Sequence, residues 1–344
     1  MKHHLLRTLK GVGVVIITLF LCYACSVNKK LKVIETTNSI KADSISFHYS
    51  KISGVGFDSG CNRRDNSDII KVDDKYYVYY SKMDSLTTSG YWASIWYATS
   101  EDEGYTWQEQ GIALGLGEKG TFDSHSVFTP NILEYEGKYY LYYTGVKPTP
   151  GNKDNIFESN STNDYTAIGL AVADSPNGPF LRSKNNPVLE ISQVAEDFDS
   201  YRIDDAALLV RDNKVWLYYK GRSILYGKEG PKHTKMGLAI ADKPEGPFIK
   251  QTKPLIDKGH EVMIWNQNGG IASLASLSQS IHFADDGIHF SPIYIGLVNI
   301  PKALGLYRPS LNDGNRNAQV PGWGIAMTHK NKRVYLMRYI MSKK

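Results

Sequence analysis

Two kinds of short apolar segment alternate along the chain, and both recur. In the first, two apolar or aromatic runs flank a polar turn, at residues 69–80, 132–143 and 208–219. The turns read Asp-Asp, Glu-Gly and Asp-Asn, which is typical of β-hairpins. In the second, a strand pattern leads into a polar turn with glycine and then an aromatic residue, at 97–107, 170–180, 238–248 and 281–290.

Together the two segments predict four antiparallel strands, the content of one propeller blade. Blades are expected to start near residues 65, 128, 204 and 269. A hairpin at 323–339 supplies the fifth blade, and residues 45–57 add its closing strand from the other end of the chain. We therefore predict an all-β, five-bladed β-propeller, whose closure removes exposed sheet edges. A β-sandwich is the alternative, but it does not predict a repeat of this length.

Residues 1–24 predict a lipoprotein signal peptide rather than part of the fold. Lys2, Arg7 and Lys10 precede an apolar stretch at 11–21 that is too short to span a bilayer comfortably. Ala24-Cys25 at its end resembles a lipobox, which predicts lipidation of Cys25; an ordinary secretory signal is the alternative. Both predict export, and the lipid anchor would hold the protein in the bacterial envelope, in the periplasm or on the outer-membrane surface. Residues 25–50 are expected to form a tether and 51–344 the catalytic propeller.

The charge balance changes once the predicted leader is removed. The whole chain has 40 Lys+Arg and 35 Asp+Glu. Without the three basic residues of the leader the net charge is small, so the charge balance does not indicate binding of nucleic acid. Only Cys61 remains in the predicted folded body, which excludes an internal disulfide there.

Carboxylates near the starts of the inner strands are the first candidate site. Inner strands of a propeller direct side chains at the central channel, so equivalent polar positions converge there. The first and third hairpins align without gaps at an offset of 139 residues, which places Asp65 on Asp204. Asp68 and Asp205 are the alternatives in register, and a strand-capping role is the structural alternative.

His260-Glu261 is the second candidate, because an ionisable pair enters an otherwise apolar stretch before Gly269-Gly270. The pattern His-Glu-x-x-His is absent, so the pair does not predict a zinc site. A solvent-facing turn is the alternative interpretation.

Four separated motifs, at residues 63–65, 97–107, 125–131 and 259–270, resemble glycoside hydrolase family 117, with a more distant similarity to family 43. The resemblance implies a five-bladed propeller and an inverting exo-enzyme that releases 3,6-anhydro-L-galactose from the non-reducing end of algal galactan oligosaccharides. It allows a divalent cation in the channel, although no spacing here requires a cofactor. Family members swap an N-terminal helical segment between subunits, whereas only about 30 residues precede the propeller here. Whether this chain forms a homodimer is therefore an open question. The stretches around Arg308 and Trp323 depart from the family pattern.

Inversion requires a base that activates water and an acid on the opposite side of the sugar. Asp65 is the predicted base. The resemblance implies that His260 is the acid, whereas chemistry alone also allows Glu261, and Asp204 would orient the acid or bind a hydroxyl. The predicted substrate contacts, each of which could instead be a strand-rim residue, are Arg64, His125, Lys220, Trp265 and, as an aromatic subsite, Trp92.

The sequence also allows two rival functions. One is an α-L-arabinofuranosidase or β-xylosidase like those of family 43. The other is a surface propeller that binds glycans without turnover. In all three cases the partner is an oligosaccharide, and the membrane is contacted only through the lipid anchor.

Overall fold

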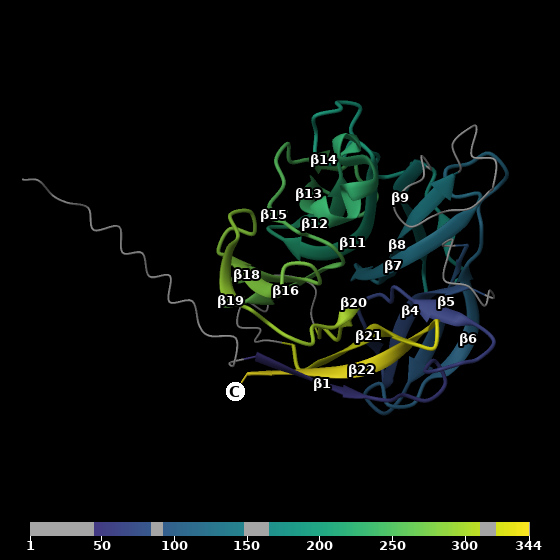
Figure 1. Ribbon diagram of the computed structural model, residues 1–344. Helices are drawn as coiled ribbons and strands as arrows, with labels where there is room; N and C mark the ends of the chain where they lie inside the picture. Colours follow the sequence, from purple (N-terminus) through teal and green to yellow (C-terminus); the bar gives the residue numbers. More distant parts are fainter. Residues whose placement is uncertain (1–44, 84–91, 148–164, 310–320, 344) are drawn as a thin grey trace, which may run out of the picture. The chain divides into compact units, whose positions relative to one another are not determined.

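The computed structural model describes residues 45–83, 92–147, 165–309 and 321–343. These residues form five antiparallel sheets arranged around one axis, which confirms the predicted five-bladed β-propeller (Figure 1). Among them the only helical segment is the 3₁₀ stretch η2 (Ile224–His233), and no described helix is long and apolar enough to cross a bilayer. The predicted signal peptide and Cys25 lie outside the described residues.

The blades follow one another along the chain, each starting with its inner strand. Blade 1 consists of β2 (Asn62–Arg64), β3 (Ile70–Val72), β4 (Lys75–Met83), β5 (Ser94–Ser100) and β6 (Gln108–Leu114). Blade 2 consists of β7 (Ser126–Tyr135), β8 (Lys138–Lys147), β9 (Tyr165–Ala173) and β10 (Leu181–Arg182). Blade 3 consists of β11 (Arg202–Arg211), β12 (Lys214–Arg222), β13 (Lys235–Ala241), β14 (Ile249–Lys250) and β15 (Ile256–Asp257).

Blade 4 consists of β16 (Val262–Gln267), β17 (Gly270–Ala275), β18 (Ser280–Ala284) and β19 (Ser291–Ile295). Its start, predicted near residue 269, was placed too late, because Asn268-Gly269 is the turn between its first two strands. Both residues have positive φ, as such a tight turn requires.

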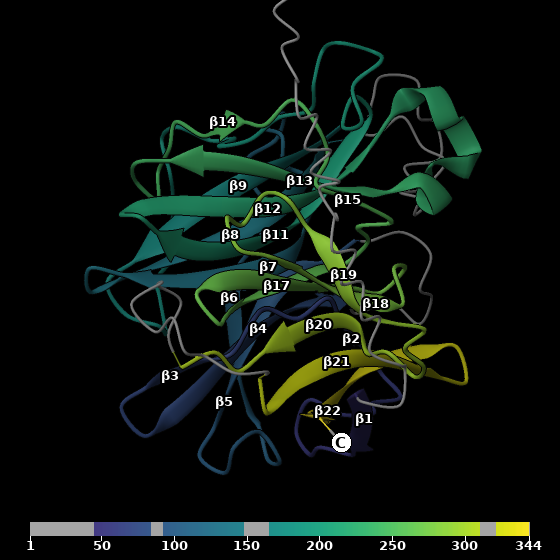
Figure 2. The same ribbon diagram turned by 90° about the vertical axis from the view of Figure 1, so that its left-hand side faces the viewer.

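Blade 5 closes the ring with strands from both ends of the described chain. Its order is β20 (Lys302–Leu306), β21 (Trp323–Lys330), β22 (Arg333–Lys343) and β1 (Ile45–Ser50) (Figure 2). Pairing of β1 with β22 confirms the predicted closing strand. It also corrects the predicted domain boundary, because residues 45–50 lie in the propeller and not in a tether.

The repeated tyrosines explain why the second strands read as continuous apolar runs. The sheets pack face to face, so both faces of a strand such as β8 are buried. Tyr79, Tyr142 and Tyr218 occupy the same place in blades 1, 2 and 3. Each hydroxyl donates to a turn carbonyl between the outer strands of the next blade, at 2.5, 2.6 and 2.9 Å. These bonds satisfy buried phenols and connect neighbouring blades.

A repeated Phe-Asp pair anchors the loops that lead into β7 and β11. Asp123 accepts hydrogen bonds from Tyr143 (2.8 Å) and Arg182 (2.7 Å). Asp199 in blade 3 accepts from Tyr219 (2.8 Å) and Lys250 (2.7 Å) in the same way. In both blades a cation from the outermost strand therefore fixes the loop that precedes the innermost strand.

Candidate active site

The centre of the propeller is built from five residues with left-handed backbone conformation, one from each blade. They are Asp65 (φ 49°), Thr129 (46°), Asp205 (56°), Glu261 (53°) and Ala303 (44°). We call these five residues the ring. In blades 2, 3 and 5 the regular pairing between the inner strand and its neighbour is interrupted at the ring residue. None of the five is glycine, so the conformation costs energy that the surrounding structure must offset.

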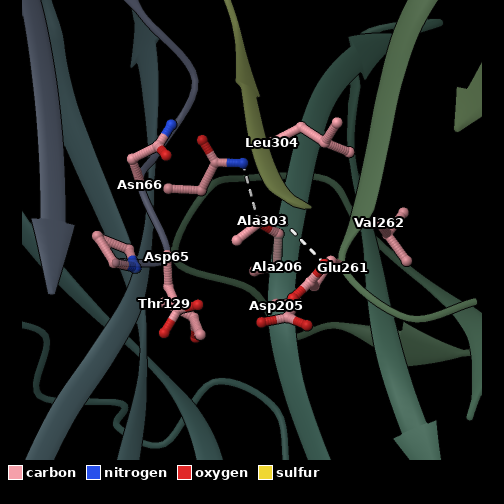
Figure 3. A pocket seen from close by; sticks show the side chains of 11 residues that line it. Asp65, Asn66, Thr129, Asp205, Ala206, Glu261, Val262, Ala303 and Leu304 are labelled. Carbon is pink, nitrogen blue, oxygen red and sulfur yellow. Dashed lines mark hydrogen bonds between the residues drawn. The ribbon is translucent and has the colours of Figure 1, made fainter. Parts of the chain in front are cut away.

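These ring residues line a cavity that is described as two compartments with shared walls. The axial compartment, about 30 Å³, contains all five, together with Asn66, Asn131 and neighbouring residues (Figure 3). This is roughly the space for two water molecules. The mouth compartment, about 80 Å³, shares Asp65, Thr129, Asp205 and Glu261 with it. The remaining lining residues of the mouth compartment are Arg64, Phe128, Arg202, Lys220, Arg222 and His260.

Asp205, and not Asp204, is the counterpart of Asp65 on the ring. Arg64 pairs with Ser81 across β2 and β4, and Asp204 pairs with Lys220 across β11 and β12. Ser81 and Lys220 are equivalent positions, because they are separated by the same 139 residues as Tyr79 and Tyr218. Their partners Arg64 and Asp204 are therefore equivalent as well. The assignment of Asp204 to the site by the 139-residue offset was wrong by one residue, because the inner strand of blade 1 is broken between β2 and β3 and holds one extra residue there.

Asp204 lies behind the cavity as the centre of a buried charge network. Its carboxylate is fully buried and contacts Arg202 (2.6 Å) and Lys220 (2.8 Å). Burial alone would raise its pKa, but Lys220, Arg202 and Arg222 lower it well below the usual range. Asp204 is therefore a permanent anion that holds the blade 3 cations in place.

Asp205 shares Lys220 with Asp204, at 2.7 Å, but faces the cavity. Burial raises the pKa of Asp205, and the Asp204 charge adds to this effect against the attraction of Lys220. Lys220 itself is buried, and the two aspartates raise its pKa despite the opposing cost of burial. The predicted contact at Lys220 therefore lies in the cavity wall, as an orienting cation between two carboxylates.

Asp65 and Arg64 form the blade 1 part of the site. Arg64 Nε lies 2.5 Å from Asp65 Oδ2, and both side chains line the mouth compartment. Asp65 is mostly buried, so its carboxylate is presented to the cavity more than to bulk water.

His260 and Glu261 extend the cavity wall from blade 4. His260 Nε2 lies 3.6 Å from Glu261 Oε1, and the backbone N–H of Ala303 donates to Glu261 Oε2 at 2.9 Å. Burial on its own raises the pKa of Glu261. The charge and hydrogen bond of His260, with the Ala303 N–H, outweigh burial and lower that pKa strongly. Glu261 is thus held as an anion beside the His260 ring.

The floor below the ring joins four blades through one buried ion pair. Asp68 of blade 1 contacts Arg308, accepts a hydrogen bond from Leu306 N–H in blade 5 (2.9 Å), and donates its own N–H to Asn131 of blade 2 (3.1 Å). Arg308 also donates to the Leu208 carbonyl of blade 3 at 2.8 Å. Asp68 is therefore a structural residue beneath the cavity, not a ring carboxylate.

The predicted aromatic contacts lie away from the described cavity lining. Trp265 is only 2% exposed and packs in the core between blades 4 and 5, so it cannot offer a stacking face. Trp92 is half-buried and packs on the core cluster that contains Phe128. Its ring lies 5.8 Å from that of His125. Neither Trp92 nor His125 is among the described residues that line the cavity.

The donor set does not fit a divalent cation in the described part of the channel. Arg64 and Lys220 contact two of the ring carboxylates, and the third is bound by Ala303 and His260. Cations at these positions repel a further positive ion. No group of three or more His, Cys, Asp or Glu suited to a metal occurs among the described residues.

Thr129, Ala303, Arg202 and Arg222 are cavity residues that the sequence reasoning missed. Thr129 lies inside the 125–131 motif, but an uncharged residue at a ring position gives no chemical signal by itself. Ala303 acts through its backbone, which no side-chain pattern can indicate. The alternation Arg-x-Asp at 202–204 and Lys-x-Arg at 220–222 was visible, and strand periodicity would have placed these cations together.

Comparison with known proteins agrees with this architecture. The family model "Glycosyl hydrolases family 43" matches residues 62–221. A family 117 glycoside hydrolase from the marine bacterium Zobellia galactanivorans superposes with a TM-score of 0.73 and 28% sequence identity, covering 87% of this chain and 91% of that chain. A thermostable family-43 glycoside hydrolase shares the fold, with a TM-score of 0.55, 15% identity, and coverage of 86% and 92%.

A curated relative, Xylosidase/arabinosidase 43A of Humicola insolens, is 28% identical over 126 residues. The match covers 37% of this chain and 35% of the relative, so the chain spans about a third of that protein. The ring of carboxylates in a single axial cavity and these similarities lead to the same conclusion. The chain has the five-bladed propeller fold found in glycoside hydrolases, and it resembles family 117 and, more distantly, family 43.

Proposed function

We propose that the protein is an exo-acting, inverting glycosidase that removes 3,6-anhydro-L-galactose, or a related terminal sugar, from algal galactan oligosaccharides. The observation that carries the proposal is the convergence of Asp65, Asp205, Glu261 and His260 on one axial cavity. The buried Asp68–Arg308 pair is bonded through Asp68 to Asn131, which lines the axial compartment. A cavity with a floor suits the end of a sugar chain better than its middle.

In this mechanism Asp65 is the general base and accepts a proton from water, while the water oxygen attacks the anomeric carbon. The glycosidic C–O bond breaks, and the leaving oxygen takes a proton from His260. Such acid and base groups flank the sugar roughly 6.5–9.5 Å apart in inverting enzymes. Asp205 replaces Asp204 in the third role, in which it binds a sugar hydroxyl or orients the acid.

The lowered pKa of Glu261 favours His260 over Glu261 as the acid, because a carboxylate held ionised has no proton to give. Glu261 instead lies beside the acid, with its Oε1 3.6 Å from His260 Nε2, and orients the ring. The lipid anchor at Cys25 and the envelope location stay predictions from the sequence.

The assay that tests the function is a panel of agar-, porphyran- and carrageenan-derived oligosaccharides with product identification. We expect release of a single terminal sugar, and the fresh product should show the inverted anomer by NMR. A retained anomer would contradict the water-base mechanism. Binding by calorimetry without product from any of these sugars would instead support a glycan-binding propeller.

A second candidate, an α-L-arabinofuranosidase or β-xylosidase, is supported by the family 43 match and by the curated relative. Aryl-arabinosides and aryl-xylosides in the same panel separate it from the first. Turnover of these substrates with no release from neoagarobiose would favour the second candidate.

Two substitutions should distinguish the two candidate acids. With His260 as the acid, Glu261→Gln removes only the buried carboxylate beside the imidazole, so part of the activity should be retained. His260→Gln should lower kcat by about 10²–10⁴-fold at every pH. Loss of activity in Glu261→Gln at every pH, with His260→Gln still active, would make Glu261 the acid.

A further inference from the structure

Thr129 occupies the ring position in blade 2 that carboxylates occupy in blades 1, 3 and 4. It lines both the axial and the mouth compartment, as Asp65 does. In Figure 3 Thr129 and Asp65 lie on one side of the cavity, and Asp205 and Glu261 lie on the other. The position is therefore equivalent to that of the three acids, but the residue there is neutral.

The backbone at Thr129 is in an unfavourable conformation. Its φ is 46°, in the left-handed region, where a β-branched residue is a genuine outlier. Pro130 follows it, and a residue before proline is further restricted. Glycine or asparagine would adopt this conformation at lower cost. Such strain concentrates at functional sites, so the threonine side chain needs an explanation beyond folding.

Contacts around Thr129 fix both its position and its hydroxyl. Its N–H donates to Ser81 Oγ at 3.0 Å, and Ser81 is the strand partner of Arg64, next to Asp65. Thr129 is therefore anchored against the blade that carries the base. Its Oγ1 lies 2.5 Å from Oγ1 of Thr144, which is fully buried. When Thr129 donates to Thr144, its own lone pairs are left to accept a hydrogen bond from the cavity.

We propose that Thr129 positions the attacking water, an inference that rests on the proposed function. The water gives one proton to Asp65 as its oxygen bonds to the anomeric carbon, and its second O–H donates to Thr129 Oγ1. Thr129 in turn donates to Thr144. The axial compartment, with space for roughly two waters beside both residues, is the reservoir for this water.

Two substitutions separate the hydroxyl from the shape of the side chain. Thr129→Val keeps the β-branch and the backbone strain but removes the hydroxyl. Thr129→Ser keeps the hydroxyl and reduces the crowding. We expect kcat to fall about 10- to 100-fold in the valine variant with KM within about threefold of wild type, because a fixed hydrogen bond to the nucleophile is lost. The serine variant should stay within about threefold in both parameters.

Thr99→Val is the matched control, because Thr99 is also a buried threonine whose hydroxyl binds a side chain, that of Gln110 at 2.9 Å. It should lower the melting temperature without changing kcat. Wild-type kcat in a folded Thr129→Val chain, or a raised KM with kcat unchanged, would overturn the assignment. If the wild-type chain releases no sugar from the panel, the proposed function itself is wrong. If the wild type is active, wild-type kcat in the valine variant refutes only the role of Thr129.

Discussion

An Asp65→Asn chain should fold normally and bind oligosaccharide, but its kcat should be about 10³–10⁴-fold lower than that of the wild type. Asparagine has the same shape as aspartate but cannot take a proton from water. It also tolerates the left-handed conformation at this position, where φ is 49°. Loss of activity could not then be attributed to a distorted ring. Steady-state kinetics and calorimetric titration on the same preparation measure both effects.

Asp73→Asn provides the control for this change. Asp73 is exposed in the hairpin turn of the same blade and has a similar φ of 52°. The same chemical substitution there should leave kcat within about twofold of the wild-type value. Full hydrolytic activity in Asp65→Asn would remove this residue from the mechanism.

Replacing Arg308 with methionine should produce the largest loss of stability. The substitution leaves the Asp68 carboxylate buried without its guanidinium, and breaking a buried pair in this way costs about 3–5 kcal/mol. At this chain length that corresponds to a melting temperature lower by about 10 °C. Denaturant unfolding and a thermal scan would measure the change.

The double variant Asp68→Asn with Arg308→Met tests the physical reason for that loss. Removing both charges should recover part of the lost stability, because no uncompensated charge then remains. Lys75→Met is the control, since it breaks an exposed pair with Glu101 at 3.5 Å and should change stability by no more than about 0.5 kcal/mol. Equal losses of stability in Arg308→Met and Lys75→Met would show that the buried Asp68–Arg308 pair is worth no more than an exposed ion pair.

The fold was predictable from the sequence because its repeats are carried by the most buried strands. The aromatic runs at 75–80 and 138–143 are nearly identical, and each forms the second strand of a blade. Their tyrosines bind the next blade, so the same physical requirement imposes the same residues. Blade 4 lacks this run, and its start was placed about seven residues too late.

The site was predictable in composition but not in register. A gap-free alignment holds between Tyr79 and Tyr218, where strands are regular, and fails by one residue at the ring, where blade 1 has its break. Adjacent aspartates at 204 and 205 made this error invisible in the sequence. One of them is a buried ion-pair centre and the other faces the cavity.

Roles that depend on packing could not be predicted in the same way. Trp265 looked like a stacking surface, but an inner strand of a propeller is covered on both faces, so the indole is core. Thr129 and Ala303 lie on the ring because of backbone conformation, which a propensity argument would have assigned to glycine or asparagine.

The ring of left-handed residues also bears on how such a protein can change its chemistry over evolutionary time. The main chain, rather than the side chain, sets the direction in which each of the five positions points. One blade can therefore exchange its residue while the other four keep their geometry. Ala303 is the simplest example: it contributes an N–H and a small methyl group, so its blade has room to acquire a new reactive group. A scaffold of this kind can diversify one position at a time.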